Sequence, residues 1–401
     1  MKILNIKDYG VQPNSQLLQT KEIQNVIDEC HHLGGGEVQI PGGKYMIGSL
    51  RLYSNIKLHL LENAQLIGSE NYKDYEDFHV PTTINYVHDK HYVELWNLPQ
   101  YYIYGMICAF QETNVSIIGE KGSMINGQDC YDENGEEKFR GPMGIVLSQC
   151  QNIELKGYTF ENCANWSHQI DSCQNIEIES VHIKAGHDGF DLHHCQNVHI
   201  HNCRLETGDD CFAGYNIEHL KVENCYINTA CNALRVGGYD LVFDNCTFEG
   251  PGHYPHRSED TFYTHSIFKY YAIRPDIINQ DGGKIKICNS QFKDMTMMLS
   301  YQYGQESLMQ NNKPLRELSF ENCTIDGLSK KSFFKGNGES CCLIFKDVSF
   351  ILEKGEEILE IDESIELILE NISCHHQIVI IAPKESRIKQ RHCQNIIVKE
   401  S

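Results

Sequence analysis

The sequence predicts an all-β protein, folded as a parallel β-helix of about ten coils from residue 37 onward. The prediction depends on five consecutive segments that align with one another and begin at Met143, Trp166, Asp188, Asp210 and Asn232. Their starts are 23, 22, 22 and 22 residues apart. Each segment holds short runs in which apolar and polar residues alternate, which is the period of a strand and leaves no room for a helix. A repeat this short buries its apolar face only by stacking on its neighbours.

Two residue types recur in register within the repeat. The tripeptide Cys-Gln-Asn begins at Cys150, Cys173 and Cys195. Recurrent asparagine at one turn position is expected in a stack, because side-chain amides can hydrogen-bond from coil to coil. The chain has 18 cysteines and no Cys-x-x-Cys pair. We interpret them as reduced side chains that pack in the core, with disulfides or a zinc site as the alternatives.

The flanking elements follow from breaks in the repeat. Residues 1–36 are expected to cap the N-terminal end of a single domain that spans residues 1–401. Thr20 can cap a helix, because apolar residues at helical spacing follow it before a run of glycines. Those apolar residues are Ile23, Val26, Ile27 and Cys30. Two longer stretches, 71–104 and 250–283, interrupt the coil rhythm and are expected to flank a cleft as functional loops; the alternative is that they only cover the flanks.

The charge of the chain restricts its partners. There are 34 lysines and arginines against 55 aspartates and glutamates, a net charge of −21. This balance argues against nucleic acid or an anionic membrane as the main partner. No apolar run approaches the length of about 18 residues that a membrane span needs, and no signal peptide is visible. We therefore expect a cytoplasmic protein.

The repeat also brings aspartates together. Asp188 and Asp210 occupy the same position in adjacent coils, whose strands lie about 4.8 Å apart, and Asp209 adjoins Asp210. Asp191 follows three residues after Asp188, in a column that contains Arg235. A stacked pair of like charges is unstable unless something uses it. Calcium could use such oxygens, and glycoside hydrolysis needs one carboxylic acid and one carboxylate; an acidic structural turn is the third alternative.

Ring side chains near the aspartates favour a sugar ligand. Trp166 could stack on a sugar face and His168 could contact a sugar hydroxyl, although a tryptophan buried in the core is the alternative. His193 and His194 are adjacent and point to opposite faces of a strand, and no other ligand set lies at zinc spacing. We therefore expect no metal.

Several motifs, spread over residues 8–300, carry a family resemblance. They include "YGVQPNS", "GGGEVQIPGGKYMIGSLRLYSNIKLHL", "NVSIIGEKGSMINGQ", "DGFDL" and "GDDC". In order and spacing they resemble the polygalacturonases of glycoside hydrolase family 28. The resemblance implies a right-handed β-helix that hydrolyses pectic α-glycosides with inversion and without a cofactor. It also implies that Asp209 is the general acid, while Asp188 and Asp210 position and deprotonate the attacking water.

Two positions depart from the family pattern. Asn232 stands where the family has the histidine of a Gly-His-Gly motif, and the Arg-x-Lys motif that grips a galacturonate carboxylate is not recognisable. Lys269 and Arg274 lie in its vicinity, and Arg235 could take its place. The expected substrate contacts are Asp191, Asn232, Arg235, His168, Trp166, Lys269 and Arg274.

The hypothesis from sequence is an exo-acting glycoside hydrolase of pectin-derived or related plant oligosaccharides. Exo action is inferred from stretch 71–104, which could close one end of the cleft, and from the expected compartment. One alternative is a polysaccharide lyase on the same fold, which would use calcium and a basic residue. The other is a carbohydrate-binding β-helix without catalysis. The sugar, the linkage and the oligomeric state are left open.

Overall fold

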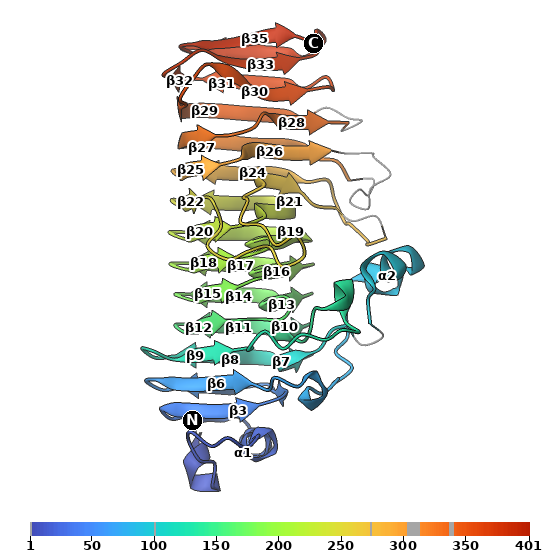
Figure 1. Ribbon diagram of the computed structural model, residues 1–401, viewed down its shortest axis with the longest axis vertical. Coiled ribbons are helices and arrows are strands. Elements are labelled where there is room, and N and C mark those ends of the chain that lie inside the picture. The colour runs from blue at the N-terminus through green and yellow to red at the C-terminus, as the bar shows by residue number, and fades with distance from the viewer. Residues whose placement is uncertain (1, 100–101, 273–274, 303–312, 337–340) are drawn as a thin grey trace. The chain divides into compact units, whose positions relative to one another are not determined.

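The computed structural model describes residues 2–99, 102–272, 275–302, 313–336 and 341–401. The chain divides into two compact units, Met1–Thr207 and Gly208–Ser401, and each is described here by itself. Each unit is a right-handed parallel β-helix, in which strands at equivalent positions of successive coils pair in parallel (Figure 1). A right-handed crossover is the favoured sense for parallel strands.

Three ladders of parallel strands make up the first unit. The first ladder consists of β1 (Lys2–Asn5), β2 (Gly36–Ile40), β5 (Ile56–Leu60), β8 (Thr113–Gly119), β11 (Gln151–Lys156), β14 (Gln174–Glu179) and β17 (Gln196–His201). The second consists of β3 (Gly43–Ile47), β6 (Ala64–Gly68), β9 (Met124–Asn126), β12 (Thr159–Glu161), β15 (His182–Ala185) and β18 (Arg204–Thr207). The third consists of β4 (Leu50–Arg51), β7 (Gly105–Phe110), β10 (Met143–Ser148), β13 (His168–Asp171) and β16 (Phe190–His193).

The second unit repeats this plan with longer strands. Its first ladder consists of β19 (Phe212–Glu223), β21 (Asn232–Asp244), β24 (Gly283–Cys288), β27 (Glu317–Leu328), β29 (Cys342–Ile351), β31 (Glu366–Glu370) and β34 (Arg387–Arg391). The second is formed by β20 (Tyr226–Thr229), β22 (Thr247–Glu249), β25 (Gln291–Met295) and β32 (Ser373–Cys374), with the later halves of β27 and β29. The third adds β23 (Ser266–Tyr270), β26 (Met297–Gln302), β28 (Ser332–Lys335), β30 (Glu356–Ile361), β33 (Ile378–Ala382) and β35 (Ile396–Glu400) to the start of β21. The described ladders thus hold more coils than the about ten expected, because the repeat continues through the last strand.

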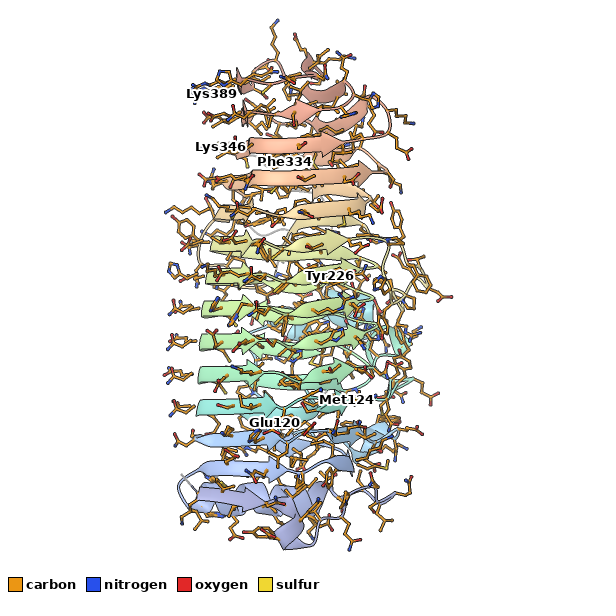
Figure 2. The ribbon with its side chains drawn as sticks, turned by 90° about the vertical axis from the view of Figure 1, so that its left-hand side faces the viewer. Glu120, Met124, Tyr226, Phe334, Lys346 and Lys389 are labelled. Carbon is orange, nitrogen blue, oxygen red and sulfur yellow. The ribbon has the colours of Figure 1, made fainter. Side chains whose placement is uncertain are left out.

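Alternation along each strand explains why these segments coil. In β14, Ile176 and Ile178 are buried, while Glu177 between them is half-exposed. In β29, Phe345 is buried. Lys346, which follows it, is exposed and is labelled in Figure 2. Because successive side chains of a strand point to opposite faces, the apolar set of every coil lies in the interior.

An asparagine ladder stabilises one turn of the first unit. The Nδ2 atom of Asn152 donates to Oδ1 of Asn114 (3.0 Å), Asn175 donates to Asn152 (3.1 Å) and Asn197 donates to Asn175 (3.2 Å). These residues adopt positive φ, between 56° and 59°, which asparagine tolerates better than most residues. The coil-to-coil amide bonds predicted from the repeat are confirmed.

The cysteines pack in the interior. All 18 lie in the described ranges, none is bridged to another, and most are buried. Cys150, Cys173 and Cys195 are fully buried in successive coils. Of the adjacent pair, Cys341 is buried and Cys342 is half-exposed, since neighbouring strand residues point to opposite faces.

The helices of the described residues lie at the N-terminal end, in the insertion 71–104 and in the turn between β9 and β10. Helix α1 (Thr20–His32) contacts β2 and β4 and buries the four apolar residues that the sequence places at helical spacing. The predicted cap by Thr20 is wrong: Gln19 occupies that position without a side-chain bond, and Oγ1 of Thr20 instead accepts from the N–H of Gly48 (2.8 Å). The remaining helices are η1 (Ile6–Tyr9), η2 (Tyr72–Asp74), η3 (Asn85–His88), α2 (Lys90–Trp96) and η4 (Glu136–Lys138). None of the helices in the described residues has both the length and the apolar character needed to cross a membrane.

The two inserted stretches differ from the expectation in one respect. The described residues of stretch 71–104, which are 71–99 and 102–104, form short helices and no strand, as expected of an insertion. Stretch 250–283 contains β23, which pairs with β21 as a regular strand of the third ladder. The second insertion is therefore the shorter segment 251–265, which precedes β23.

Candidate active site

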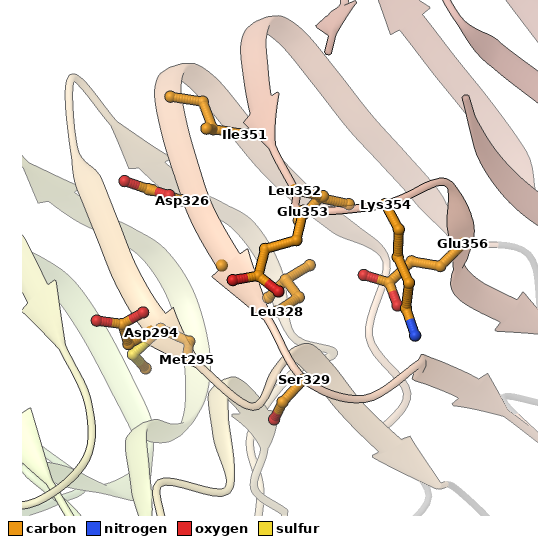
Figure 3. A pocket seen from close by; sticks show the side chains of 11 residues that line it. Asp294, Met295, Asp326, Leu328, Ser329, Ile351, Leu352, Glu353, Lys354 and Glu356 are labelled. Carbon is orange, nitrogen blue, oxygen red and sulfur yellow. The ribbon is translucent and has the colours of Figure 1, made fainter. Parts of the chain in front are cut away.

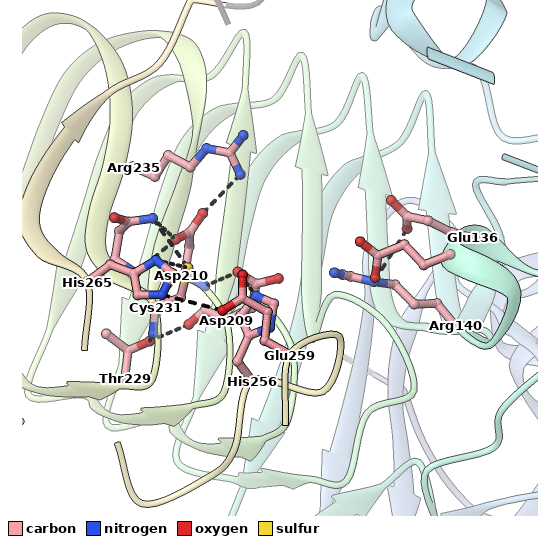
Figure 4. A network of polar contacts seen from close by, with 12 residues as sticks. Glu136, Arg140, Asp209, Asp210, Thr229, Cys231, Arg235, His256, Glu259 and His265 are labelled. Carbon is pink, nitrogen blue, oxygen red and sulfur yellow. Dashed lines mark hydrogen bonds and ion pairs between the residues drawn. The ribbon is translucent and has the colours of Figure 1, made fainter. Parts of the chain in front are cut away.

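Asp209 and Asp210 lie in the turn that precedes β19 (Figure 4). The Oγ1 atom of Thr229, at the end of β20, donates to the carbonyl oxygen of Asp209 (2.5 Å). The N–H of Asp210 donates to Oδ1 of Asp209 (3.1 Å). Asp209 is 9% exposed and Asp210 is 0% exposed. The turn therefore holds two neighbouring carboxylates in a fixed orientation and largely away from solvent.

Three donors hold the Asp210 carboxylate. Its Oδ1 atom accepts from the backbone N–H of Asn232 (3.1 Å) and from Asn232 Nδ2 (2.8 Å), and its Oδ2 atom accepts from Arg235 Nη1 (3.2 Å). The Oδ1 atom of Asn232 accepts from Ser266 Oγ (2.7 Å), on the strand paired with β21. Asn232 is buried, and its amide donates to Asp210 and accepts from Ser266, so in this structure it orients Asp210; its expected contact with a substrate stays a prediction.

A second cation lies on the coil after Arg235. Lys269 in β23 is the register partner of Arg235 in β21, and the Arg235 guanidinium lies 4.4 Å from the ring centre of Tyr271. Lys269 is half-buried, and no carboxylate of the described residues lies within ion-pair distance of it. Burial, followed by repulsion from Arg235, lowers the pKa of Lys269 from its ordinary value. The expected contact Arg274 lies outside the described residues.

The insertion 251–265 adds groups that the sequence argument missed. His256 Nε2 lies 3.4 Å from Asp209 Oδ1, and His265 Nδ1 lies 3.6 Å from Cys231 Sγ. Glu259 Oε2 lies 3.7 Å from His265 Nε2, and burial lowers the pKa of His265 (Figure 4). The available signal was the run "GHYPHRSED" in a stretch already expected to carry function. The insertion has no repeat register, however, so the alignment could not say which histidine meets Asp209.

The first unit holds the other predicted residues. Asp188 lies in the turn before β16 and is 5% exposed, and its carbonyl oxygen accepts from Ser167 N–H (2.9 Å). Asp191 lies in β16, with its Oδ1 atom 3.3 Å from His193 Nε2. Trp166 is largely buried, with its ring centre 5.8 Å from that of His193. Within the first unit, Trp166 lies just before β13, Asp188 lies just before β16 and Asp191 lies in β16. Because β13 and β16 are paired, the three residues belong to neighbouring coils of the third ladder.

His168 belongs to the interior of the first unit. It is 0% exposed, its Nε2 atom lies 2.9 Å from the hydroxyl of Tyr158, and its ring centre lies 4.8 Å from that of Phe190. Burial lowers the pKa of His168 to about 3, so it stays neutral. A fully buried imidazole has no face open to a sugar. The expectation that His168 contacts a sugar hydroxyl is therefore replaced by a packing role.

The insertion 71–104 is fastened to the first unit at Asp171. The Asp171 Oδ2 atom accepts from Thr82 Oγ1 (2.8 Å) and from Thr83 N–H (2.7 Å), and Thr83 Oγ1 also bonds the carboxylate. One coil earlier, at the end of β10, Ser148 Oγ donates to the carbonyl oxygen of Pro81 (2.5 Å). Segment 81–83 is thus fixed against the ends of β10 and β13.

A buried glutamate completes this attachment. Glu136 Oε2 accepts from the Tyr102 hydroxyl (2.8 Å) and from Asn165 Nδ2 (3.3 Å), and lies 3.9 Å from Arg140 Nε (Figure 4). Burial raises the pKa of Glu136, partly offset by Arg140. The Tyr102 ring meets Trp166 edge-on, with centres 5.6 Å apart. The insertion therefore forms a wall beside Trp166.

A separate groove of about 520 Å³ lies near the later turns of the second unit (Figure 3). Four carboxylates line it, those of Asp294, Asp326, Glu353 and Glu356. Lys354 is the single cation among the lining residues. Its negative charge repels an acidic sugar, so this groove does not suit a uronate substrate.

Comparison with known proteins identifies the class. Residues 38–239, just over half of the chain, match the family described as Glycosyl hydrolases family 28. The class that the fold and the match define is that of the glycoside hydrolase families. It belongs to glycosyl hydrolases family 28, as the sequence motifs indicated.

Curated relatives match over parts of their length. An exo-poly-α-D-galacturonosidase of Dickeya chrysanthemi is 40% identical over 76 residues, which are 19% of this chain and 12% of that protein. A probable polygalacturonase of Vitis vinifera is 27% identical over 188 residues, 45% of this chain and 36% of that protein. The chain therefore matches much less than two thirds of the length of these relatives. A family 28 exopolygalacturonase of Yersinia enterocolitica has the same fold, with a TM-score of 0.68 at 17% identity over 96% of this chain and 79% of that one.

Proposed function

We propose that this glycoside hydrolase cleaves α-glycosidic bonds of pectin-derived or related plant oligosaccharides, with inversion and from a chain end. The observation that carries the proposal is the buried pair Asp209 and Asp210, in which Asp210 is held by Asn232 and Arg235. Hydrolysis with inversion needs one protonated carboxylic acid and one ionised carboxylate, and the different surroundings of the two groups set these protonation states. The different partners of the two aspartates support such a division.

The roles follow the family resemblance. Asp209 gives its proton to the glycosidic oxygen as the bond to the anomeric carbon breaks. A water attacks that carbon from the opposite face and loses a proton to a carboxylate, for which we propose Asp210 with Asp188. The role of Asp188 is supported by its place in the same repeat column as Asp210. His256, 3.4 Å from Asp209, acts through that carboxyl group as a positioning residue.

The charges beside Asp210 support an acidic sugar. Arg235 is paired with Asp210, whereas Lys269 on the next coil has no carboxylate partner in the part of the chain described. A half-buried cation without a counterion is stabilised by an incoming anion. We propose that Lys269, with Arg235, binds a uronate carboxylate. Asp191 and Trp166 are proposed as further sugar contacts.

Exo action is proposed from the wall formed by stretch 71–104. Its attachment consists of part-buried hydrogen bonds at Asp171 and a buried one at Glu136, so it can limit how far a chain extends. The names of the Dickeya and Yersinia relatives, both exo-acting, support this mode. A cytoplasmic location is also part of the proposal, and the buried reduced cysteines support it. The substrate would then be an imported oligosaccharide.

A product assay tests the proposal. The purified chain and its Asp209→Asn variant are incubated with a panel of pectic and neutral plant oligosaccharides, with and without a chelator. We expect new reducing ends from acidic oligosaccharides, released one unit at a time, not reduced by the chelator and lost in the variant. Proton NMR of the first product formed reads the anomeric configuration. Retention of that configuration, or no product from any acidic oligosaccharide, would contradict the proposal.

One observation favours a second candidate, a polysaccharide lyase. The lowered pKa of Lys269 makes it a better proton acceptor than an ordinary lysine. A lyase would give an unsaturated product, seen by its ultraviolet absorbance, and would lose activity in Lys269→Met more than in Asp209→Asn. If no bond is cleaved but the oligosaccharides bind, the protein is a carbohydrate-binding β-helix.

A further inference from the structure

Three different metal-binding side chains meet in the second unit. They are the carboxylate of Asp209, the thiol of Cys231 and the imidazole of His256, and their ligand atoms all lie within 4.8 Å of one another (Figure 4). They come from three separate places: the turn before β19, the turn before β21 and the insertion 251–265. Each of the three residues is buried, and the side chains of His256 and Asp209 are 11% and 12% exposed.

The spacing of the donor atoms suits a tetrahedral zinc ion. With bonds of about 2.0–2.1 Å to nitrogen and oxygen and about 2.3 Å to sulfur, a nitrogen and an oxygen ligand lie about 3.4 Å apart, and a nitrogen and a sulfur ligand about 3.6 Å apart. His256 Nε2 lies 3.4 Å from Asp209 Oδ1. The separation between His256 and Asp209 therefore matches an edge of such a tetrahedron, and Cys231 Sγ lies within 4.8 Å of both ligand atoms.

The chemistry of the ligands selects the ion. Calcium and magnesium are bound by oxygen atoms, and this cluster offers one carboxylate with a sulfur and an imidazole nitrogen. Sulfur and imidazole together favour zinc and similar transition metals. His265 is not part of this group: its Nδ1 atom approaches Cys231 Sγ, but its ring centre lies 6.4 Å from that of His256, too far for both rings to bind one tetrahedral ion.

We propose that Asp209, Cys231 and His256 form a binding site for a zinc-class divalent ion, and that the bound ion inhibits hydrolysis by occupying Asp209. The binding clause stands on the geometry alone. The inhibition clause rests on the proposed function, because it requires Asp209 to be the proton donor. A metal that holds this carboxylate prevents it from carrying a proton.

A second cluster provides the control. In the first unit, His201 Nε2 lies 2.7 Å from Glu177 Oε1, and His199 Nδ1 lies 3.0 Å from the same oxygen. These side chains are only half-buried, and the cluster contains no sulfur. A double variant, His199→Gln with His201→Gln, removes this competing zinc-binding cluster and leaves the site at Asp209 intact.

The first measurement is zinc binding to the full chain. The metal-free double variant is titrated with zinc against a chromogenic chelator, alone and with Cys231→Ser or His256→Gln added. We expect one tightly bound zinc in the double variant, and a loss of affinity in either added variant larger than the roughly 10–100-fold that loss of an outer-shell partner causes. His256→Gln, on an insertion, covers the case in which Cys231→Ser does not fold. Zinc binding that neither added variant weakens, or none in the double variant, would overturn the site.

Two further readouts separate binding from inhibition. Cobalt bound at the site should show thiolate-to-metal absorption that disappears in Cys231→Ser. Zinc should inhibit the double variant, while the same variant with Cys231→Ser keeps its activity in zinc. Cobalt absorption without inhibition overturns the second clause alone. If the zinc-free protein has no hydrolase activity, the proposed function fails, and the binding result still decides the site.

Discussion

The two insertions of this β-helix are attached in different ways. Stretch 71–104 is fastened to Asp171, Ser148 and Glu136, none of which is a candidate for the reaction. Segment 251–265 instead brings His256 against Asp209 and His265 against Cys231. The first insertion therefore shapes the space beside the ladder, while the second changes the surroundings of a reacting group. The difference is visible only in which atoms each insertion contacts, because both look alike in sequence.

The largest effect is expected at the second insertion. His256→Ala removes the imidazole beside Asp209, and a misplaced acid costs about 100-fold in kcat, with KM little changed. His256→Gln should recover part of the loss, because its amide can still donate to the carboxylate. Steady-state kinetics measure both. Asp260→Asn, an exposed position on the same insertion, is the matched control. Equal losses in Asp260→Asn would mean that the insertion acts only as a cover.

A smaller and different effect is expected at the first insertion. Asp171→Ala removes the acceptor for Thr82 and Thr83, and each hydrogen bond to a charged group contributes about 1.5–3 kcal/mol. The segment should open, so KM rises about 10-fold and internal cleavage products appear, while kcat is retained. Product chromatography and limited proteolysis within 71–104 report this. Thr83→Val, which keeps the backbone bond, should show an intermediate change. A loss of kcat without a change in products would break the comparison.

The pH dependence of substrate binding sharpens the role of Lys269. Its pKa is lowered, so it is charged at low pH and loses its proton at a lower pH than an ordinary lysine. Affinity for an acidic sugar should therefore be present at low pH and be lost as the pH rises through the lowered pKa. Lys269→Arg keeps its charge and should remove most of this rise in KM, which we expect to be a few-fold. KM profiles that coincide for the two proteins would exclude a carboxylate contact at Lys269.

The smallest effect on activity is expected at His168, which lies in β13 with Asp171. Its burial should affect the pH dependence of stability instead. His168 has a pKa of about 3 in the fold, below its ordinary value of 6.5, so the unfolded chain takes up a proton that the folded chain does not. Stability is therefore lost as the pH falls from about 6.5, at about 1.4 kcal/mol per pH unit. The pair His168→Phe and Tyr158→Phe removes this dependence without an unsatisfied hydroxyl. Urea midpoints between pH 7 and 5, compared with Tyr158→Phe alone, measure it; identical slopes would show that His168 is not held neutral.

Much of the architecture could be predicted because the repeat fixes register. The 22-residue spacing placed Asp210, Asn232 and Arg235 in related positions, and the structure brings them into contact. The repeat could not predict that the Asn232 side chain would hydrogen-bond to Asp210 and Ser266. Alignment of the repeats gives the place of a residue in its coil, but not the orientation of its side chain. His168 was misassigned for the same reason: every residue of β13 is buried, so alternation does not separate its two faces.

Insertions limited the prediction most. His256, His265 and the strand β23 all lie in stretch 250–283, where no repeat carries the register forward. The prediction also failed at the start of the helix. The hydroxyl of Thr20 accepts a hydrogen bond from the backbone N–H of Gly48, in a distant turn, and does not cap the helix. These contacts depend on chain segments that are far apart in sequence, and local patterns do not report them.

The common register of the coils also determines how such a chain can change its length. Ile153 pairs with Ile176, and Ile176 pairs with Val198, so each coil repeats the choice of inward and outward positions made by the one before. One extra residue within β14 would turn Ile178 outward and Glu179 inward, and the coil would no longer stack. A duplicated coil keeps every face in place, and a turn can accept extra residues without disturbing the ladders. Such a protein can therefore grow in whole coils, while new chemistry enters through its turns.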